Sequence, residues 1–237
     1  MKTLLTTLAL AAVSFSAAAQ PKTVALASAA PAVAATAAVA PDAYTSAMLD
    51  IIAAQSVATT PAALQATLAQ LERVAAAAPT AWEPRYYQTR AHVKMGFAGS
   101  DGEAQDKCFD QAQAALDAAL KLKGADRSEL LVLQAHLLQG RIMVSPMLRG
   151  PRYTGQVQEA LAEAKALNPN NPRVYLVLGN DLYYRPAFFG GGGDKAKPLY
   201  EKALALFGTF RPANALSPVW GKALAESSLA RINAPAK

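Results

Sequence analysis

The amino-acid sequence predicts an all-α protein: a right-handed α-solenoid of about four helix-turn-helix units followed by a C-terminal capping helix. Three observations predict this fold. Similar segments recur at a nearly constant spacing, apolar residues within them recur three and four positions apart, and no segment alternates between apolar and polar residues as a strand does. Because one helix pair cannot cover its own apolar face, successive pairs are expected to stack and bury it continuously.

The first helix of each unit starts at a recurring position. The segment "PDAYTSAMLDIIA" begins at Pro41, "PRYYQTRAHVKMG" at Pro84, "SELLVLQAHLLQG" at Ser128 and "PRVYLVLGNDLYY" at Pro172. These starts are 43, 44 and 44 residues apart. A fixed period of this size indicates an array of supersecondary units.

The second helix of each unit follows the first. In order, the segments are "AALQATLAQLERVAAAAP", "CFDQAQAALDAALKL", "GQVQEALAEAKALNP" and "DKAKPLYEKALALF". Leu64, Leu68 and Leu71 show the helical spacing of their apolar residues.

The segment "SPVWGKALAESSLARI" predicts the capping helix. Ser217 suits an N-cap and Pro218 the first helical position. Trp220 and Leu224 would then share the face that covers the last unit.

The N-terminus predicts export. Residues 1–19 have a basic start at Lys2, an uncharged apolar stretch and small residues before the expected cleavage point, as in a signal peptide. Residues 20–40, rich in Ala and Pro, predict a flexible spacer, and 41–237 the repeat domain. We expect a periplasmic or secreted protein with no transmembrane segment, and no lipid attachment, since no cysteine lies near the cleavage point.

Composition restricts the partners. Cys108 is the only cysteine, so no internal disulfide can form, and its helical surroundings favour a buried thiol. The net charge of +6 is spread along the chain without a run of five like charges, which argues against nucleic-acid binding.

The last unit resembles a tetratricopeptide repeat. The residues that carry the resemblance are Tyr175, Leu178, Gly179, Leu182, Tyr183, Ala196, Tyr200 and Ala203. The third unit matches through Leu131, Ala135, Leu138, Leu161, Ala164 and Pro169. The resemblance implies that the two helices of a unit cross closely where Gly179 and Ala203 leave room.

The repeat period of this chain differs from that of the tetratricopeptide family. Its repeat has about 34 residues, and the excess here is predicted to lie between the two helices of each unit, in "GFAGSDGEAQ", "RIMVSPMLRGPRYTG" and "RPAFFGGGG". HEAT-type repeats fit the period better but lack the Leu-Gly and Ala-aromatic-Ala placement. The whole chain is similar to a group of exported bacterial tetratricopeptide-like proteins, which implies a fold and a compartment only.

The glycines 190–193 suggest two alternatives, a phosphate-binding loop or a turn. A Walker loop needs Gly-Lys-Ser/Thr, whereas here Asp194 precedes Lys195 and Ala196 replaces the hydroxyl. The sequence therefore predicts a turn with positive φ angles, with Asp194 as the N-cap of the next helix.

Catalytic and metal-binding motifs are missing from the sequence. It contains neither Gly-x-Ser-x-Gly nor His-Glu-x-x-His. His92 and His136 occupy equivalent positions one period apart, and Asp181 is the nearest candidate for a third metal ligand, but hydrogen-bonded histidines are the favoured interpretation. We expect no enzyme activity, no cofactor and no metal.

These features predict a non-catalytic scaffold that binds a peptide or protein of the cell envelope in the concave groove of its first helices. The candidate groove residues are Arg85, Gln88, His92, His136, Arg173, Asn180, Tyr183 and Tyr184. Arg85 and Arg173 lie two periods apart, so both guanidiniums are expected on one side, where each could grip a carboxylate. The alternative is an envelope hydrolase or a small-ligand-binding protein that uses the inserts around Arg149, Arg152 and Tyr153.

Overall fold

A computed structural model describes residues 42–234, so the predicted signal peptide and spacer lie outside the described residues. The helices are α1 (Ala43–Val57), α2 (Pro61–Ala77), α3 (Glu83–Ala98), α4 (Gly102–Leu120), α5 (Arg127–Val144), α6 (Pro146–Leu167), α7 (Pro172–Tyr184), the 3₁₀ turn η1 (Ala187–Phe189), α8 (Gly193–Thr209) and α9 (Lys222–Asn233). This range contains no strand.

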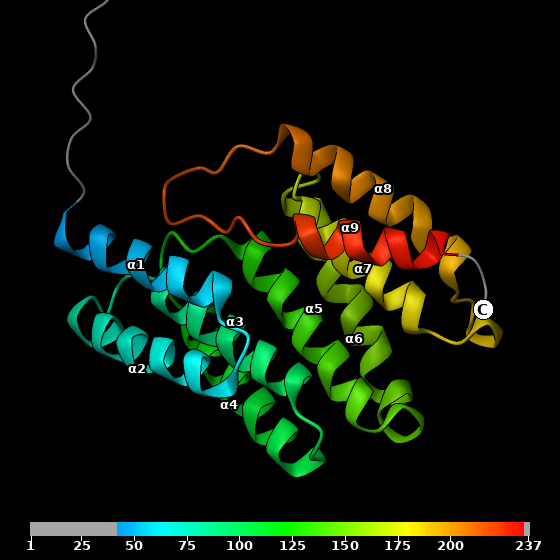
Figure 1. Cartoon of the computed structure of the whole chain (residues 1–237), viewed down its shortest axis with the longest axis horizontal. Helices are drawn as coiled ribbons and strands as arrows, with labels where there is room; N and C mark the ends of the chain where they lie inside the picture. The colour runs from blue at the N-terminus through cyan, green and yellow to red at the C-terminus, as the bar shows by residue number, and fades with distance from the viewer. Residues whose placement is uncertain (1–41, 235–237) are drawn as a thin grey trace, which may run out of the picture. The chain divides into compact units, whose positions relative to one another are not determined.

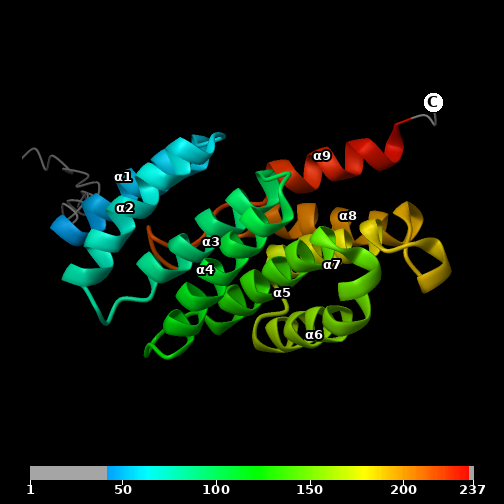
Figure 2. The same cartoon turned by 90° about the horizontal axis from the view of Figure 1, so that it is seen from below.

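The helices pack as consecutive pairs, α1 with α2, α3 with α4, α5 with α6 and α7 with α8 (Figure 1). The first helices of neighbouring pairs contact one another, and each second helix contacts the first helix that follows it. Figure 2 shows the pairs stacked in chain order, with α9 against α8. The predicted all-α solenoid of four helix pairs and a closing helix is confirmed.

Helix starts and close crossings follow from local sequence. The side chains of Asp42, Asp101 and Asp126 each accept a hydrogen bond from the backbone three residues on, which caps α1, α4 and α5. At the α7–α8 crossing, a Cβ on Gly179 would lie 2.7 Å from the Tyr200 ring. The expected need for a small residue at Gly179 is confirmed, because the Tyr200 side chain fills that space.

The inserts differ from the prediction. Nearly all of "RIMVSPMLRGPRYTG" is helical, since α5 continues to Val144 and α6 starts at Pro146. The extra length of that unit therefore lengthens its helices and forms no long loop. The α7–α8 insert is the longest of the three without α-helix, at residues 185–192, and it includes the 3₁₀ turn η1.

The predicted start of the capping helix is wrong. Ser217, Pro218 and Trp220 precede α9, whose N-cap is Gly221 with φ +114°. These residues belong to an extended connection between α8 and α9, residues 210–221, which we call the strap (Figure 1). A Cβ on Gly221 would lie 2.8 Å from the Phe207 ring, so both the backbone angle and the packing require glycine there.

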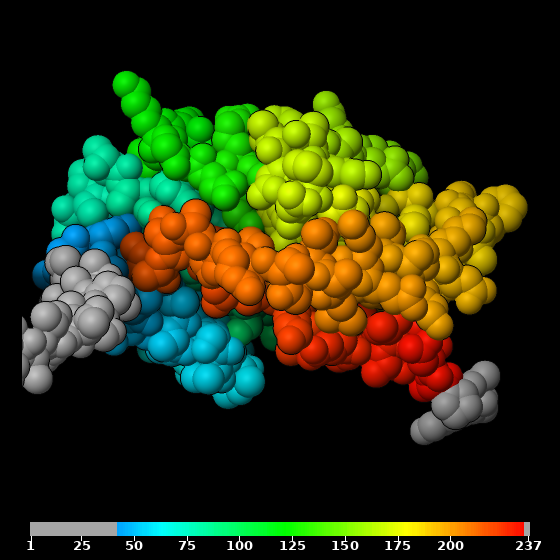
Figure 3. Space-filling view, turned by 90° about the horizontal axis from the view of Figure 1, so that it is seen from above, coloured from blue at the N-terminus to red at the C-terminus, as the bar shows by residue number. Residues whose placement is uncertain are grey.

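The strap lies on the first helices of the solenoid. Leu216 is buried among Met48 of α1 and Tyr86 and Tyr87 of α3. The Tyr87 hydroxyl donates to the Leu216 carbonyl at 2.9 Å, and Trp220 Nε1 donates to the Tyr86 hydroxyl at 2.7 Å. The space-filling view shows the strap, in orange, reaching the blue N-terminal helix (Figure 3).

The predicted positive φ angles of the glycine turn are confirmed, whereas the predicted N-cap of the following helix, Asp194, is wrong. Gly190 and Gly192 have φ angles of +82° and +122°. The α8 N-cap is Gly192, with no side-chain hydrogen bond, and Asp194 lies in the first turn of the helix. Its carboxylate can still interact favourably with the positive end of the helix dipole.

The Gly179 crossing generates a stability prediction. Gly179→Ala should lower the free energy of unfolding by about 1–3 kcal/mol, because the new methyl group collides with the Tyr200 ring. Gly155→Ala, in α6 where a Cβ would meet nothing within 4 Å, should instead raise it by up to about 1 kcal/mol. Urea unfolding of both variants measures the difference, and equal effects would contradict the close crossing.

Candidate functional site

Arg173, predicted to grip a partner in the groove, is fully buried. Its Nε lies 3.0 and 2.8 Å from the two carboxylate oxygens of Glu129, and its Nη2 donates to Glu129 Oε1 at 2.7 Å. Nη1 donates to the Trp220 carbonyl at 3.2 Å. The guanidinium is therefore held inside the protein by α5 and the strap.

Glu129 is the other half of this buried ion pair. Its carboxylate also accepts a hydrogen bond from the Tyr86 hydroxyl at 3.3 Å. Burial raises the pKa of Glu129, and the neighbouring Arg173 guanidinium opposes that rise. Three first helices, α3, α5 and α7, thus meet at one buried polar cluster.

His136 lies beneath the strap beside this cluster. Its ring stacks on Phe97, with centroids 4.7 Å apart, and on Trp220, with centroids 6.1 Å apart. Arg90 lies 5.2 Å from the centroid of the same Trp220 ring. Burial, and to a lesser extent the Arg90 charge, lowers the pKa of His136 to about 4.

His92 occupies a different environment on α3. Its pKa is lowered by burial, against the opposing effect of Glu72 on α2, and its buried Nδ1 has no hydrogen-bond partner. Asp181, the third candidate metal ligand, pairs instead with Arg185. No cluster of three or more metal-ligating side chains occurs between residues 42 and 234.

The other predicted groove residues are engaged locally. Arg85 donates to Gln88 at 3.0 Å. The Asn180 side chain accepts from the Tyr200 hydroxyl at 2.8 Å, and the Tyr184 hydroxyl accepts from Arg231 of α9 at 3.0 Å. Tyr183 packs edge-to-face against Tyr184, with ring centroids 4.9 Å apart. The eight residues do not form one open groove, because the strap covers its centre at His136 and Arg173.

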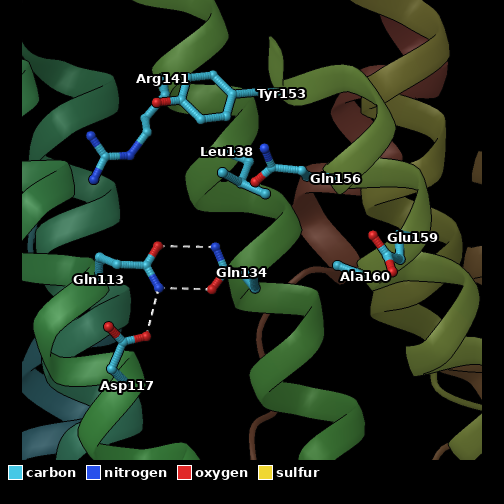
Figure 4. Close-up of a pocket in the computed structure, with 9 residues that line it drawn as sticks. All are labelled: Gln113, Asp117, Gln134, Leu138, Arg141, Tyr153, Gln156, Glu159 and Ala160. Carbon is cyan, nitrogen blue, oxygen red and sulfur yellow. Dashed lines mark hydrogen bonds between the residues drawn. The ribbon is translucent and has the colours of Figure 1, made fainter.

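An open cleft lies instead on the second-helix side, where α4 and α6 flank α5 (Figure 4). This amide cleft has a volume of about 570 Å³. Gln113 and Gln134 exchange two hydrogen bonds of 2.8 and 3.0 Å across it. Its lining residues are Gln113, Asp117, Gln134, Leu138, Arg141, Tyr153, Gln156, Glu159 and Ala160.

A second hollow of about 520 Å³ adjoins the amide cleft and shares Arg141 and Tyr153 with it. We call it the arginine hollow. Its lining residues are Asp106, Asp110, Arg141, Leu148, Arg149, Arg152 and Tyr153. The first two turns of α6 supply Leu148 to Tyr153, and α4 presents its two aspartates one turn apart.

Two ion pairs fix the α4 side of the arginine hollow. Arg149 donates to both oxygens of Asp106 at 2.6 and 2.7 Å, and Arg141 contacts Asp110 at 2.8 Å. The bond from Arg149 lowers the pKa of Asp106. These arginines are therefore positioned and their charges largely balanced before any ligand arrives.

The α6 side of the hollow is apolar and cationic. Arg152 is exposed and lies 5.2 Å from the centroid of the Tyr153 ring. Leu148 is 78 % exposed, and its neighbour Met147 is 87 % exposed. Arg149, Arg152 and Tyr153, predicted as an alternative site in the insert, are brought together here.

Sequence reasoning missed the α4 contribution to this hollow. Asp106 and Asp110 are spaced by four residues, which places them on one helix face, and this was the available signal. Arg141 and Leu148 lie in the insert "RIMVSPMLRGPRYTG", but nothing in the sequence marked these two residues individually as lining a site.

Comparison with known proteins identifies a structural relative. The solved structure of the HusA haemophore from Porphyromonas gingivalis superposes with a TM-score of 0.73 at 30 % sequence identity, covering 81 % of this chain and 94 % of HusA. The chain belongs to the HusA family. The shared HusA fold is all-helical, in agreement with the helix pairs described above. No protein-family model matches the sequence, and no curated protein does.

Within residues 42–234, none of the helices combines the length and the apolar character needed to cross a membrane.

The buried Arg173–Glu129 pair generates a second stability prediction. Arg173→Met should lower the free energy of unfolding by about 3–5 kcal/mol, because it leaves the Glu129 carboxylate buried and unpaired. Adding Glu129→Met should recover most of that loss. The exposed pair Arg127–Glu163 is the control, and its loss should cost under about 1 kcal/mol. Chemical denaturation of the single and double variants measures these free energies of unfolding. If the losses from Arg173→Met and Glu129→Met simply add in the double variant, the pairing is contradicted.

His136 generates a pH prediction. Its pKa is about 4 in the folded protein and about 6.5 when unfolded, so the folded state binds fewer protons between these values. Stability should therefore fall as the pH drops from about 6.5 towards 4, with His136 alone costing about 2 kcal/mol at pH 5.

The matched variant is His136→Phe, which keeps the stacking and cannot titrate. The stability difference between pH 7.5 and pH 5 should be smaller in the variant by about the same 2 kcal/mol. The same pH dependence in both proteins would show that His136 is solvated.

Proposed function

We propose that this protein is an exported, non-catalytic binding protein whose cargo is heme or a similar flat porphyrin, and that the arginine hollow holds that cargo. The observation that carries the proposal is the likeness to a haemophore, a heme-binding protein, over nearly the whole of that relative. The arginine hollow supplies the matching chemistry on the described surface.

A porphyrin has a broad apolar face and carboxylates at one edge. The volume of the hollow, about 520 Å³, lies within the usual range for small-ligand sites. Leu148 and the Tyr153 ring offer apolar and aromatic contact to the face. Arg152, exposed at the rim, can pair with a propionate carboxylate in the bidentate geometry that guanidinium favours.

The hollow's charged groups favour binding over catalysis. Asp106 and Asp110 each face an arginine, and the lowered pKa of Asp106 keeps that carboxylate ionised rather than available as a general acid. No histidine or cysteine is among the residues that line the hollow, so the contacts proposed here are to the ring and its carboxylates.

The concave peptide groove is the second candidate site. Binding there would cost more free energy than binding in the arginine hollow. A peptide on the inner helices would have to displace the strap. Displacement would break the Trp220–Tyr86 and Arg173–Trp220 hydrogen bonds and expose Leu216. The arginine hollow requires no such rearrangement.

The proposal also includes the type of helical repeat. We infer that the helix pairs are tetratricopeptide-like, supported by Gly179 facing Tyr200 and by the buried Ala196 and Ala203 of α8. Such units commonly present binding surfaces along a solenoid. Export through the N-terminal segment would place this surface in the periplasm or outside the cell.

Hemin titration tests the function and the site together. The wild-type protein should bind hemin saturably, with a change in the Soret absorption. Combining Leu148→Asp with Arg152→Glu should weaken binding at least about tenfold, because it removes the apolar contact and reverses the rim charge.

The matched control is Arg127→Glu, an exposed charge reversal outside the residues that line the hollow, which should leave hemin affinity unchanged. Absence of saturable binding by the wild-type protein would reject the function. Unchanged affinity in the Leu148/Arg152 variant would reject the site and keep the function.

A further inference from the structure

The α7–α8 connection carries a second exposed apolar feature, whose residues line neither the amide cleft nor the arginine hollow. Phe188 is 91 % exposed, Phe189 62 % and Tyr184 70 %. The two phenylalanine rings pack edge-to-face, with centroids 5.2 Å apart. Residues 184–189, which we call the aromatic tip, lie at one extremity of the helical domain, at the yellow-to-gold turn in Figures 1 and 3.

The backbone of the tip is braced. The amides of Gly190, Gly191 and Gly192 donate to the carbonyls of Ala187, Pro186 and Leu182 at 2.9, 3.2 and 2.8 Å. The Lys195 ammonium donates to the Gly190 carbonyl at 3.1 Å. The two phenylalanines are thus presented outward on a fixed turn.

The glycines make this presentation possible. Gly190 and Gly192 have positive φ angles, and a Cβ on Gly191 would lie 1.9 Å from the Arg185 carbonyl oxygen. The conformation of this turn therefore requires glycine at all three positions, and it holds the Phe188 and Phe189 rings in solvent. Clustered exposed apolar side chains of this kind mark an interaction surface.

Shape and charge indicate the partner. The rings protrude and line neither hollow, so they suit a deformable surface that a protrusion can enter. Lys195 and Lys197 at the start of α8 and Arg231 on Tyr184 are basic groups near the tip. The nearby acids are Asp194, at the start of α8, and Asp181, which pairs with Arg185. A bilayer with anionic headgroups above an apolar layer matches both features.

We propose that the aromatic tip docks this protein reversibly onto anionic phospholipid membranes, with Phe188 and Phe189 entering the headgroup region. Aromatic side chains are favoured at that depth, and nearby lysine and arginine add attraction to negative lipids. The proposal does not depend on the heme proposal, because it uses different residues and a different surface.

Vesicle co-sedimentation tests it. The wild-type protein should sediment with phosphatidylethanolamine–phosphatidylglycerol vesicles and remain in solution with pure phosphatidylcholine. Phe188→Ser combined with Phe189→Ser should reduce the bound fraction at least about fivefold, and Lys195→Glu should reduce it less and in a salt-dependent way.

The matched control is Met147→Ser combined with Leu148→Ser, an equally exposed apolar pair on α6, which should keep vesicle binding. The Phe188/Phe189 variant should keep its melting temperature and its hemin affinity, because both rings are exposed and lie outside the arginine hollow. No sedimentation of the wild-type protein with anionic vesicles would overturn the proposal. Equal sedimentation of the Phe188/Phe189 variant would overturn it as well.

Discussion

The buried ion pair between Arg173 and Glu129 is the constraint on which the rest of the structure depends. Its partners lie 44 residues apart, one period of the solenoid, so the pair fixes how the third and fourth helix pairs stack. Two buried charges are tolerated only when their remaining hydrogen-bonding groups are also satisfied. Here Tyr86 supplies a donor to Glu129, and the Trp220 carbonyl accepts from Arg173. The polar cluster therefore specifies the position of the strap as well as that of the helices.

The strap changes where function can lie. In an open solenoid, the inner helices would offer Arg173 and His136 to a partner. In this protein Trp220 stacks on His136, and Leu216 packs in one cluster with residues of α1 and α3, so the strap covers the centre of the inner face. The open surfaces are on the second-helix side, at the arginine hollow, and at the aromatic tip. These two surfaces differ in chemistry: the arginine hollow is recessed and lined by charged side chains, and the aromatic tip carries exposed phenylalanine rings.

Much of the fold could be predicted from the sequence because periodicity is a local signal. The 44-residue spacing follows directly from it, and the small residue at Gly179 is what the resemblance to a tetratricopeptide repeat implies. The strap could not be predicted, because Ser217 and Pro218 resemble a helix start, whereas their neighbours Leu216 and Trp220 are bonded to Tyr87 and Tyr86, 129 and 134 residues earlier in the chain. The site was predictable in part. Arg149, Arg152 and Tyr153 stood out in an insert, but their α4 partners are joined to them only by tertiary packing.

The central claim is that ligand binds outside the solenoid while the strap stays closed on the inner face. Hydrogen–deuterium exchange with and without hemin tests it most directly. The account predicts slower exchange in the first turns of α6 and the facing turns of α4, with no change in the strap or at Tyr86 and Tyr87 of α3. Hemin-dependent changes confined to the strap and the first helices would contradict it.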